Sequence, residues 1–390
     1  MTVASSYNRA LSAALALSAI FAVSCATARP SGEAASGEPI VIGAVLPLTG
    51  YGAVFGASAL NGMRLAFDEA NAKGGVLGRP LELRVRDDKG DITAAADAFH
   101  RSVHQDRVVA VLGSIMSRIT LEGARICQPA GVPLLTPTST NPAVTETGDF
   151  IFRAAFIDPY QGTVAARFAL DTLGARTAAC VFTEDDDYAR SIAAGFRETF
   201  ESGGGVITAF EGHGYGVMDY SALLRRVLTT EPELILISDY YNDAALISLQ
   251  ARALGYSGHF MGGDGWNAPD ILRHIGRGLI GSFFVSQWHP AAPSETNAAF
   301  VAAYRGAYGS EPDAMAALGY DSARIVIDAI ERAGSTDGAA IRDAILSSEI
   351  ELATGLLRFD SIGDPIKSAA IIRIEDGAFV FDSTVDPPRE

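Results

Sequence analysis

Polar and aromatic residues gather where four predicted strands end. Ser117 and residues 136–142 follow two strands of the first half of the chain, and residues 239–241 and 262–266 follow two strands of the second half. In open α/β sheets, ligands bind outside the carboxyl ends of the strands. Ser117 is also expected to open a helix, whose free N–H groups and positive dipole end attract a carboxylate. Asp264 would supply the opposite charge, so these residues predict a site for a ligand with both charges, such as an amino acid.

Three other patterns could carry enzymatic or metal chemistry. Residues 50–56 resemble the glycine-rich turn of a dinucleotide fold, but residues 47–49 lengthen that turn, and an exported protein would meet little NAD. No Gly-x-Ser-x-Gly elbow or triad histidine supports a hydrolase. His100 and His104 lie four apart on a predicted helix without a third metal ligand, which favours a solvated helix face. The sequence therefore predicts no catalytic residue, no metal site and no cofactor.

Composition and charge set the broad class. The chain has 390 residues of which 48% are hydrophobic, enough for two or three packed domains. Its 30 Lys and Arg against 46 Asp and Glu give a net charge of −16. That charge repels phosphates and anionic lipid headgroups, which excludes nucleic acid and the membrane surface as partners. Three cysteines are too few for a disulfide scaffold, and Cys127 and Cys180 are interpreted as two separate buried thiols.

Residues 1–24 are predicted to be an export signal. The apolar run 10–23 covers about 21 Å as a helix, which is short of the ~30 Å hydrocarbon core of a bilayer. It ends in the letters AVSC (22–25), which are similar to a bacterial lipobox, so Cys25 would carry lipid. The alternative is ordinary cleavage nearby. Residues 25–38 would form a flexible tether, and the mature chain is exported in either case.

From residue 39 the pattern alternates between strand and helix. The apolar run 40–46 is typical of a strand buried on both faces, and a helix follows that ends at Gly74-Gly75. The alternation restarts after residues 150–153 and continues to about residue 285. Two such series predict an α/β fold of two lobes, each with a doubly wound, mostly parallel sheet. A terminal hairpin is predicted at Asp376-Gly377.

The series predict how the chain is divided between the lobes. Chain crossings near 153–158, 284–290 and 353–358 would make a three-crossing hinge rather than a loose tether. The expected divisions are a signal peptide over 1–24, a tether over 25–38, the first lobe over 39–155, the second lobe over 156–286, a return to the first lobe over 287–353, and a return to the second lobe with the hairpin over 354–390.

Six short motifs occur in a fixed order. They are IGAVLPLTG (42–50), NAKGGVLGRP (71–80), DDKGD (87–91), AGVP (130–133), STNP (139–142) and FMGGDG (260–265). With these motifs the chain resembles the bacterial periplasmic solute-binding proteins of Leu/Ile/Val-transport type, the ligand-capturing components of ABC importers. The resemblance covers about Ile40 to Phe381. It implies the type I periplasmic binding protein fold and ligand capture between two lobes, without covalent chemistry.

The resemblance also implies how the ends of the ligand would be bound. Ser117, the backbone at Thr138, and the hydroxyl and amide of Thr140 would hold the α-carboxylate. Ser139 belongs to the same ligand-binding set. Asp264 would accept the α-amino group.

Five further residues match family positions around the ligand. Tyr188 and Tyr240 would close over the ligand from the second lobe. Phe55, Ile115 and Met116 would line the side-chain pocket.

Three places depart from the family's pattern. Arg118 follows Ser117 where small residues are usual, and would either bind an anionic group or point outward. Trp266 lies beside Asp264 and would change the shape of the pocket. Residues 185–187 are three aspartates that would make the rim acidic, the simpler interpretation being a solvated loop with a helix-capping Asp.

The resemblance finally implies partners and a location. The ligand would be an amino acid or a related carboxylic acid or amide, the protein partner an ABC transporter permease, and the chain a monomer in the periplasm or cell envelope that meets the membrane only through a lipid anchor. The alternative is a ligand-sensing receptor lipoprotein, because the same fold serves sensors. Ala26, after the lipobox cysteine, lacks the Asp that favours inner-membrane retention, which leaves outer-membrane placement open.

Overall fold

The first lobe is built on a five-stranded parallel sheet. The protein is described by a computed structural model that covers residues 37–272 and 275–385. Strand β1 is buried along almost all of its length, as its apolar run predicts, and β2 lies at the edge of the sheet. The strands, in the order β2-β1-β3-β4-β5, are β1 (Ile40–Leu46), β2 (Leu81–Asp87), β3 (Val111–Gly113), β4 (Leu134–Thr136) and β5 (Ile151–Arg153).

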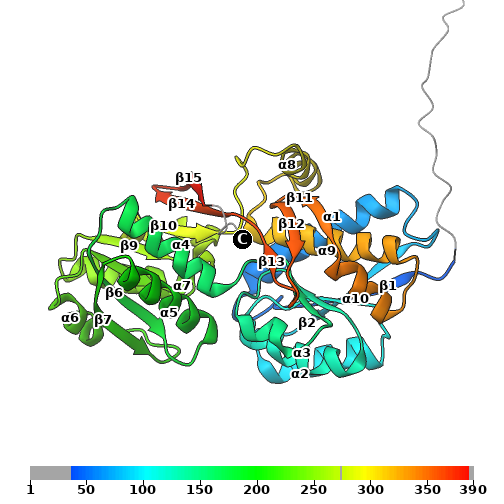
Figure 1. Ribbon diagram of the computed structural model, residues 1–390, viewed down its shortest axis with the longest axis horizontal. Helices are drawn as coiled ribbons and strands as arrows, with labels where there is room; N and C mark the ends of the chain where they lie inside the picture. The colour runs from blue at the N-terminus through cyan, green and yellow to red at the C-terminus, as the bar shows by residue number, and fades with distance from the viewer. Residues whose placement is uncertain (1–36, 273–274, 386–390) are drawn as a thin grey trace, which may run out of the picture. The chain divides into compact units, whose positions relative to one another are not determined.

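Helices from both ends of the chain cover this sheet. Those of the first series are α1 (Ala53–Ala72), α2 (Ile92–His104) and α3 (Ser117–Ala130), and those that return later are α8 (Glu295–Tyr308), α9 (Ala314–Ala333) and α10 (Gly338–Leu346). Figure 1 shows α9 running beside α1 although the two are far apart in sequence. Two glycines permit this close approach, because a Cβ on Gly62 would lie 1.9 Å from Ala316 O and one on Gly319 would lie 2.2 Å from Ala59 O.

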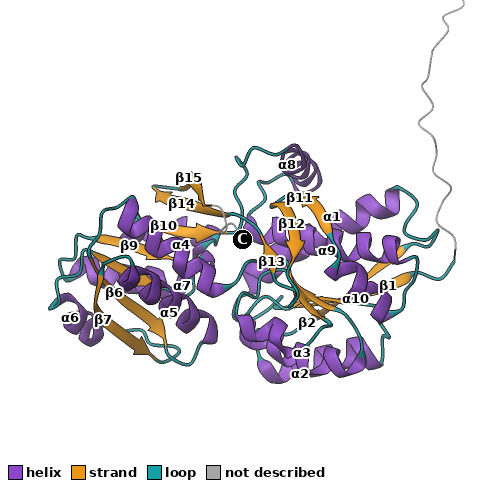
Figure 2. Ribbon diagram, viewed as in Figure 1, coloured by secondary structure: helices purple, strands orange, loops and turns teal. Residues whose placement is uncertain are grey.

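The second lobe contains a seven-stranded sheet. It runs in the order β15-β14-β10-β9-β8-β6-β7, with β6 to β10 parallel and the hairpin β14–β15 antiparallel to them. Its strands are β6 (Thr177–Thr183), β7 (Val206–His213), β8 (Leu234–Ile237), β9 (His259–Gly262), β10 (Phe283–Ser286), β14 (Ala369–Glu375) and β15 (Ala378–Val385). Its helices are α4 (Asp158–Asp171), α5 (Asp187–Ser202), α6 (Ser221–Leu228) and α7 (Tyr241–Ala253). Figure 2 shows helices on both faces of this sheet.

A third, small sheet changes the position of the last crossing. It consists of β11 (Glu349–Leu352), β12 (Gly355–Phe359) and β13 (Pro365–Ile366), and Leu352 and Leu357 are buried in the core of the first lobe. The chain therefore passes to the second lobe between β13 and β14, later than the expected crossing at 353–358. The expected segment 354–390 accordingly begins with residues that pack on the first lobe.

Short 3₁₀ helices complete the described chain. They are η1 (Pro142–Thr147), η2 (Asp264–Trp266), η3 (Pro269–Leu272) and η4 (Ile275–Leu279). Within residues 37–272 and 275–385, no helix is both long and apolar enough to cross a bilayer. The predicted signal peptide and Cys25 lie outside the described residues.

The two described cysteines are free and buried, as predicted. Cys127 lies on α3 of the first lobe and Cys180 on β6 of the second. Burial raises the pKa of the Cys127 thiol to about 12, so it carries almost no thiolate at neutral pH.

The α1–α9 contact predicts the effect of a single methyl group. Gly62→Ala places its Cβ against the Ala316 carbonyl, and we expect the free energy of unfolding to fall by about 1–3 kcal/mol. Gly306→Ala, in the exposed interior of α8 with open space around its Cβ, is the matched control and should raise stability by up to about 1 kcal/mol. Urea unfolding of both variants checks this, and equal stability of the two would contradict the packing described.

Candidate functional site

A small cavity lies between the two lobes at the ends of their strands. Its volume is about 20 Å³, close to the space of one water molecule. Eight of the ten predicted ligand-binding residues line it, together with Gly265 and Met315, which the sequence analysis did not select. The eight are Phe55, Ile115, Ser117, Thr138, Thr140, Tyr188, Tyr240 and Asp264.

Ser117 is oriented to donate a hydrogen bond into this cavity. Its Oγ accepts the backbone N–H groups of Thr140 at 3.3 Å and Asn141 at 3.1 Å. A hydroxyl has two lone pairs and one hydrogen, so only its hydrogen is left for a further partner. Ser117 is also the first residue of α3, where backbone N–H groups and the helix dipole favour an anion. This end of the cavity suits a carboxylate.

Two of the predicted residues, Thr138 and Ser139, use their hydroxyls to support the loop after β4 (residues 137–141), here called the binding loop. Thr138 Oγ1 donates to Ile115 O at 2.9 Å, so its hydroxyl hydrogen is already in use, and Thr138 lines the cavity. Ser139 Oγ bonds Thr120 Oγ1 at 2.6 Å and Ile115 O at 3.0 Å, and Ser139 does not line the cavity. Its hydroxyl therefore positions the loop.

Met116 also lies away from the cavity. It is buried on the other side of the α3 start, with its sulfur and methyl group next to Gly52 and its methyl group next to Gly90. Met315 of α9 takes the place in the apolar wall that was expected of Met116.

Arg153 holds the same loop and was missed in the sequence. Its side chain is fully buried, and it donates to Ser139 O at 2.9 Å, Asn141 O at 2.8 Å and Thr145 Oγ1 at 2.8 Å. Its Nε lies 2.6 Å from Asp364 Oδ1 in the turn between β12 and β13. The available signal was an arginine ending a buried strand, because arginine is almost never fully buried unless it is paired.

Asp264 supplies the negative end of the cavity. It accepts hydrogen bonds from Tyr188 OH and Gln287 Nε2, each at 3.0 Å, and burial raises the pKa of its carboxyl. Among the described residues, no Lys, Arg or His lines the cavity. A buried carboxylate with two neutral donors and no cation favours a cationic partner.

Gly265 fixes the position of Tyr188 beside this carboxylate. Its N–H donates to Tyr188 OH at 2.8 Å, and a Cβ on Gly265 would lie 2.7 Å from the same oxygen. Any larger residue would displace the tyrosine that donates to Asp264.

Aromatic rings from both lobes form the apolar wall. Tyr240 stacks on Tyr188 with ring centroids 4.7 Å apart, and both belong to the second lobe. From the first lobe, Tyr51 meets Tyr240 edge-on at 5.9 Å and Phe55 meets it at 6.4 Å. Tyr51 was not selected from the sequence. These contacts cross between the lobes and enclose an apolar space beside the polar groups.

Arg118 makes a contact between the lobes outside the cavity. It donates to Gly90 O at 2.8 Å, and its guanidinium lies 5.6 Å from the centre of the Tyr215 ring in the second lobe. Tyr215 OH in turn donates to Asp186 at 2.6 Å. Arg118 therefore does not line the cavity, and it contacts the second lobe rather than pointing outward into solvent.

The other departures from the pattern are also located. Asp186 caps the start of α5 by accepting from Tyr188 N, in line with the simpler interpretation of the three aspartates. Trp266 is fully buried in the second lobe at 6.4 Å from the Phe284 ring, and it does not line the cavity.

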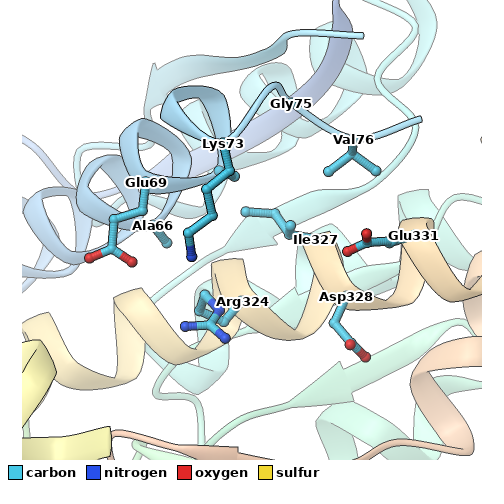
Figure 3. Close-up of a pocket in the computed structure, with 10 residues that line it drawn as sticks. Ala66, Glu69, Lys73, Gly75, Val76, Arg324, Ile327, Asp328 and Glu331 are labelled. Carbon is cyan, nitrogen blue, oxygen red and sulfur yellow. The ribbon is translucent and has the colours of Figure 1, made fainter. Parts of the chain in front are cut away.

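A hollow of about 220 Å³ lies elsewhere in the first lobe, between α1 and α9 (Figure 3). Figure 3 shows Glu69 and Lys73 reaching toward Arg324 on α9. Glu69 Oε2 accepts from Tyr320 OH at 2.7 Å, and Tyr320 OH accepts from Arg324 at 3.0 Å. None of the predicted ligand-binding residues lines this hollow. The cavity at the strand ends is therefore the candidate ligand site.

Comparison with known proteins identifies the family. The sequence matches the family model for periplasmic binding proteins over residues 39–378. The chain belongs to the periplasmic binding protein family. This confirms the resemblance drawn from the six motifs, and it makes the chain a binding protein and not an enzyme.

Solved structures of the family have the same fold as this periplasmic binding protein. A leucine-binding protein from Thermotoga maritima is 36% identical, with a TM-score of 0.86 over 89% of this chain and 99% of that one. A branched-chain amino acid transporter substrate-binding protein from Streptococcus pneumoniae, in complex with isoleucine, is 30% identical, with a TM-score of 0.84 over 90% and 100%. The predicted two-lobed α/β fold is confirmed.

A protein from Pseudomonas aeruginosa that binds leucine, isoleucine, valine, threonine and alanine is also similar. It is 29% identical over 329 residues, which cover 84% of this chain and 87% of that protein.

Arg153 predicts a large stability effect. Arg153→Ala leaves Asp364 without its cation and frees the loop carbonyls, and we expect the free energy of unfolding to fall by about 3–5 kcal/mol. Arg101→Ala breaks an exposed pair with Asp97 and should cost less than about 1 kcal/mol. Urea unfolding measures both, and a similar small loss in the two variants would refute the role given to Arg153.

Proposed function

We propose that this periplasmic binding protein captures an α-amino acid with an apolar side chain and delivers it to the permease of an ABC importer. The observation that carries the proposal is that one cavity has an end that suits a negative group and an end that suits a positive group. Ser117 and the start of α3 offer donors to a carboxylate, and buried Asp264 offers an acceptor to an ammonium group. A zwitterion satisfies both ends at once.

The apolar wall supports an aliphatic side chain. Phe55, Ile115, Met315 and Tyr240 lie beside the polar groups, where the side chain of a bound amino acid would extend. The relatives named for leucine and isoleucine support the same class of ligand. Burying one such side chain contributes about 1.5–3 kcal/mol to binding.

Lobe movement is part of the proposal. Ligand pockets usually enclose about 300–1,000 Å³, and the cavity here holds about 20 Å³. The lobes must therefore separate about their three crossings for a ligand to enter. The first-lobe groups would bind first, and Tyr188, Tyr240 and Asp264 would then come down on the ligand. The ligand shifts the equilibrium only by its preference for the closed form.

The location at the membrane belongs to the same proposal. A signal peptide over 1–24 would direct export, Cys25 would carry lipid, and residues 25–38 would tether the binding lobes close to the permease. The protein would act as a monomer and touch the bilayer only through that lipid.

Asp264 gives the first test of the ligand class. A soluble form starting at Ala26 is screened by thermal shift against amino acids, amides and aromatic acids. A ligand at 100 times its dissociation constant adds about 2.7 kcal/mol to stability, which shifts the melting temperature by several degrees. For an aliphatic amino acid, Asp264→Ala leaves the ammonium unpaired and should weaken binding by about 3–5 kcal/mol in calorimetric titration.

The exposed Asp185→Ala on the same rim is the control and should bind like the unmodified protein. Unchanged affinity in Asp264→Ala would exclude an ammonium at this carboxylate and with it the amino-acid ligand.

The contact of Arg118 with Tyr215 tests lobe closure. Arg118→Ala and Tyr215→Ala should each weaken every ligand by the same factor, about two- to fivefold, because a cation–π contact contributes about 0.5–1 kcal/mol. The double variant should bind ligand no more weakly than either single variant, because each substitution removes the same contact between the lobes.

Arg197→Ala, which removes a cation–π contact with Phe210 inside the second lobe, should lower stability and leave affinity unchanged. Additive losses, or a loss confined to one ligand, would contradict a role in closure.

A further inference from the structure

Asp158 is a second buried acid beside the cavity that the proposed site does not use. It is the first residue of α4, at the first crossing between the lobes, and it is fully buried. Its Oδ1 accepts a long hydrogen bond of 3.3 Å from Gln161 Nε2. Its Oδ2 makes no hydrogen bond of ordinary geometry among the described residues, although the side chain of Thr140 also interacts with the carboxylate. An unpartnered buried carboxylate oxygen is costly and requires an explanation.

Asp158 is connected by hydrogen bonds to residues that line the cavity. Its N–H donates to Thr140 O at 2.8 Å, and Gln161, which contacts its carboxylate, also accepts from Asp264 N at 2.9 Å. Burial raises the pKa of Tyr188 and Tyr240, and the negative charge of Asp158 adds to both shifts. The carboxylate thus acts electrostatically on the residues that would surround a ligand.

The protein supplies little positive charge to balance this acid. Arg153 is the cation that acts on Asp158, but its hydrogen bonds and its ion pair are with the binding loop and Asp364. Burial raises the pKa of Asp158 well above its usual value, Asp264 raises it further, and Thr140 and Arg153 oppose the rise. Two acids that repel one another in a buried space both gain from a cation placed between them.

We propose that Asp158 is a charge-selecting residue of the ligand site, which together with Asp264 makes the cavity accept ligands that carry an ammonium group and reject carboxylic acids that lack one. The inference rests on the proposed function and deepens it. An ammonium group stabilises both acids in their charged form, whereas a hydroxyl in its place gives neither carboxylate a cation. Asp158 acts by charge and through Thr140, so it is a positioning residue whose effect depends on the ligand.

The test compares two ligands that differ only at the group in question. L-Leucine and L-2-hydroxy-4-methylpentanoate share the carboxylate and side chain. By calorimetric titration the unmodified protein should prefer leucine. Asp158→Asn keeps the size of the side chain and removes its charge, so leucine should bind about tenfold more weakly while the hydroxy acid binds equally well or better. Asp171→Asn, at the exposed far end of α4, should leave both affinities unchanged.

The pH dependence gives a second readout that needs no variant. The groups that act on Asp158 are Asp264 on η2, Arg153 on β5, Asp186 before α5 and the side chain of Thr140. Burial raises the pKa values of both Asp158 and Asp264, and a bound ammonium group would lower them again. Leucine affinity should therefore fall as the pH is lowered through the raised pKa values, with proton release in that range, and the affinity of the hydroxy acid should not fall.

The outcomes separate this inference from the proposed function. If the unmodified protein binds neither ligand nor any other amino acid, both fail. If leucine binds but Asp158→Asn weakens both ligands by the same factor, Asp158 is only structural and this inference alone fails. Leucine affinity that stays constant as the pH is lowered over the range in which the protein remains folded overturns it in the same way, also where Asp158→Asn does not fold.

Discussion

The buried guanidinium of Arg153 ties together the three parts of the protein on which the site depends. It ends the last strand of the first sheet, holds the carbonyls of the loop at Ser139 and Asn141, and contacts Asp364 in the turn between β12 and β13 of the small third sheet. A buried charge is stable only when it is paired and hydrogen-bonded, so this geometry tolerates little change. This loop supplies the backbone N–H groups of Thr140 and Asn141 that donate to Ser117 Oγ. Arg153 therefore fixes the partners of Ser117 before any ligand arrives.

With the loop fixed, charge decides what the cavity can accept. One end has the start of α3 and the free hydrogen of Ser117, and the other has Asp264, which Gln161 connects to the buried Asp158. The apolar rings between these ends carry no charge and give little direction to a ligand. Pocket shape would therefore select the side chain, while the buried acids select the ammonium group, two requirements that different residues meet independently.

The sequence predicted the sheets and the place of the site for one physical reason. Parallel strands bring their carboxyl ends to one edge, so residues following separate strands, such as Ser117 and Asp264, meet in space. It did not predict which way a side chain faces. Ser139 turns inward because Thr120, 19 residues earlier, accepts or donates at 2.6 Å, and such long-range partners leave no local pattern. The third sheet escaped prediction for the same reason, because it packs on the first lobe through contacts distant in sequence, such as Leu357 in the core and Asp364 against Arg153.

A crystal structure of the protein grown with L-leucine tests the central claim most directly. The account predicts leucine between the lobes, with its carboxylate at Ser117 Oγ and the start of α3 and its nitrogen about 3 Å from the Asp264 carboxylate. The claim would be contradicted by leucine bound in the reverse orientation, by leucine bound away from these residues, or by crystals in which no leucine is bound at saturating concentration.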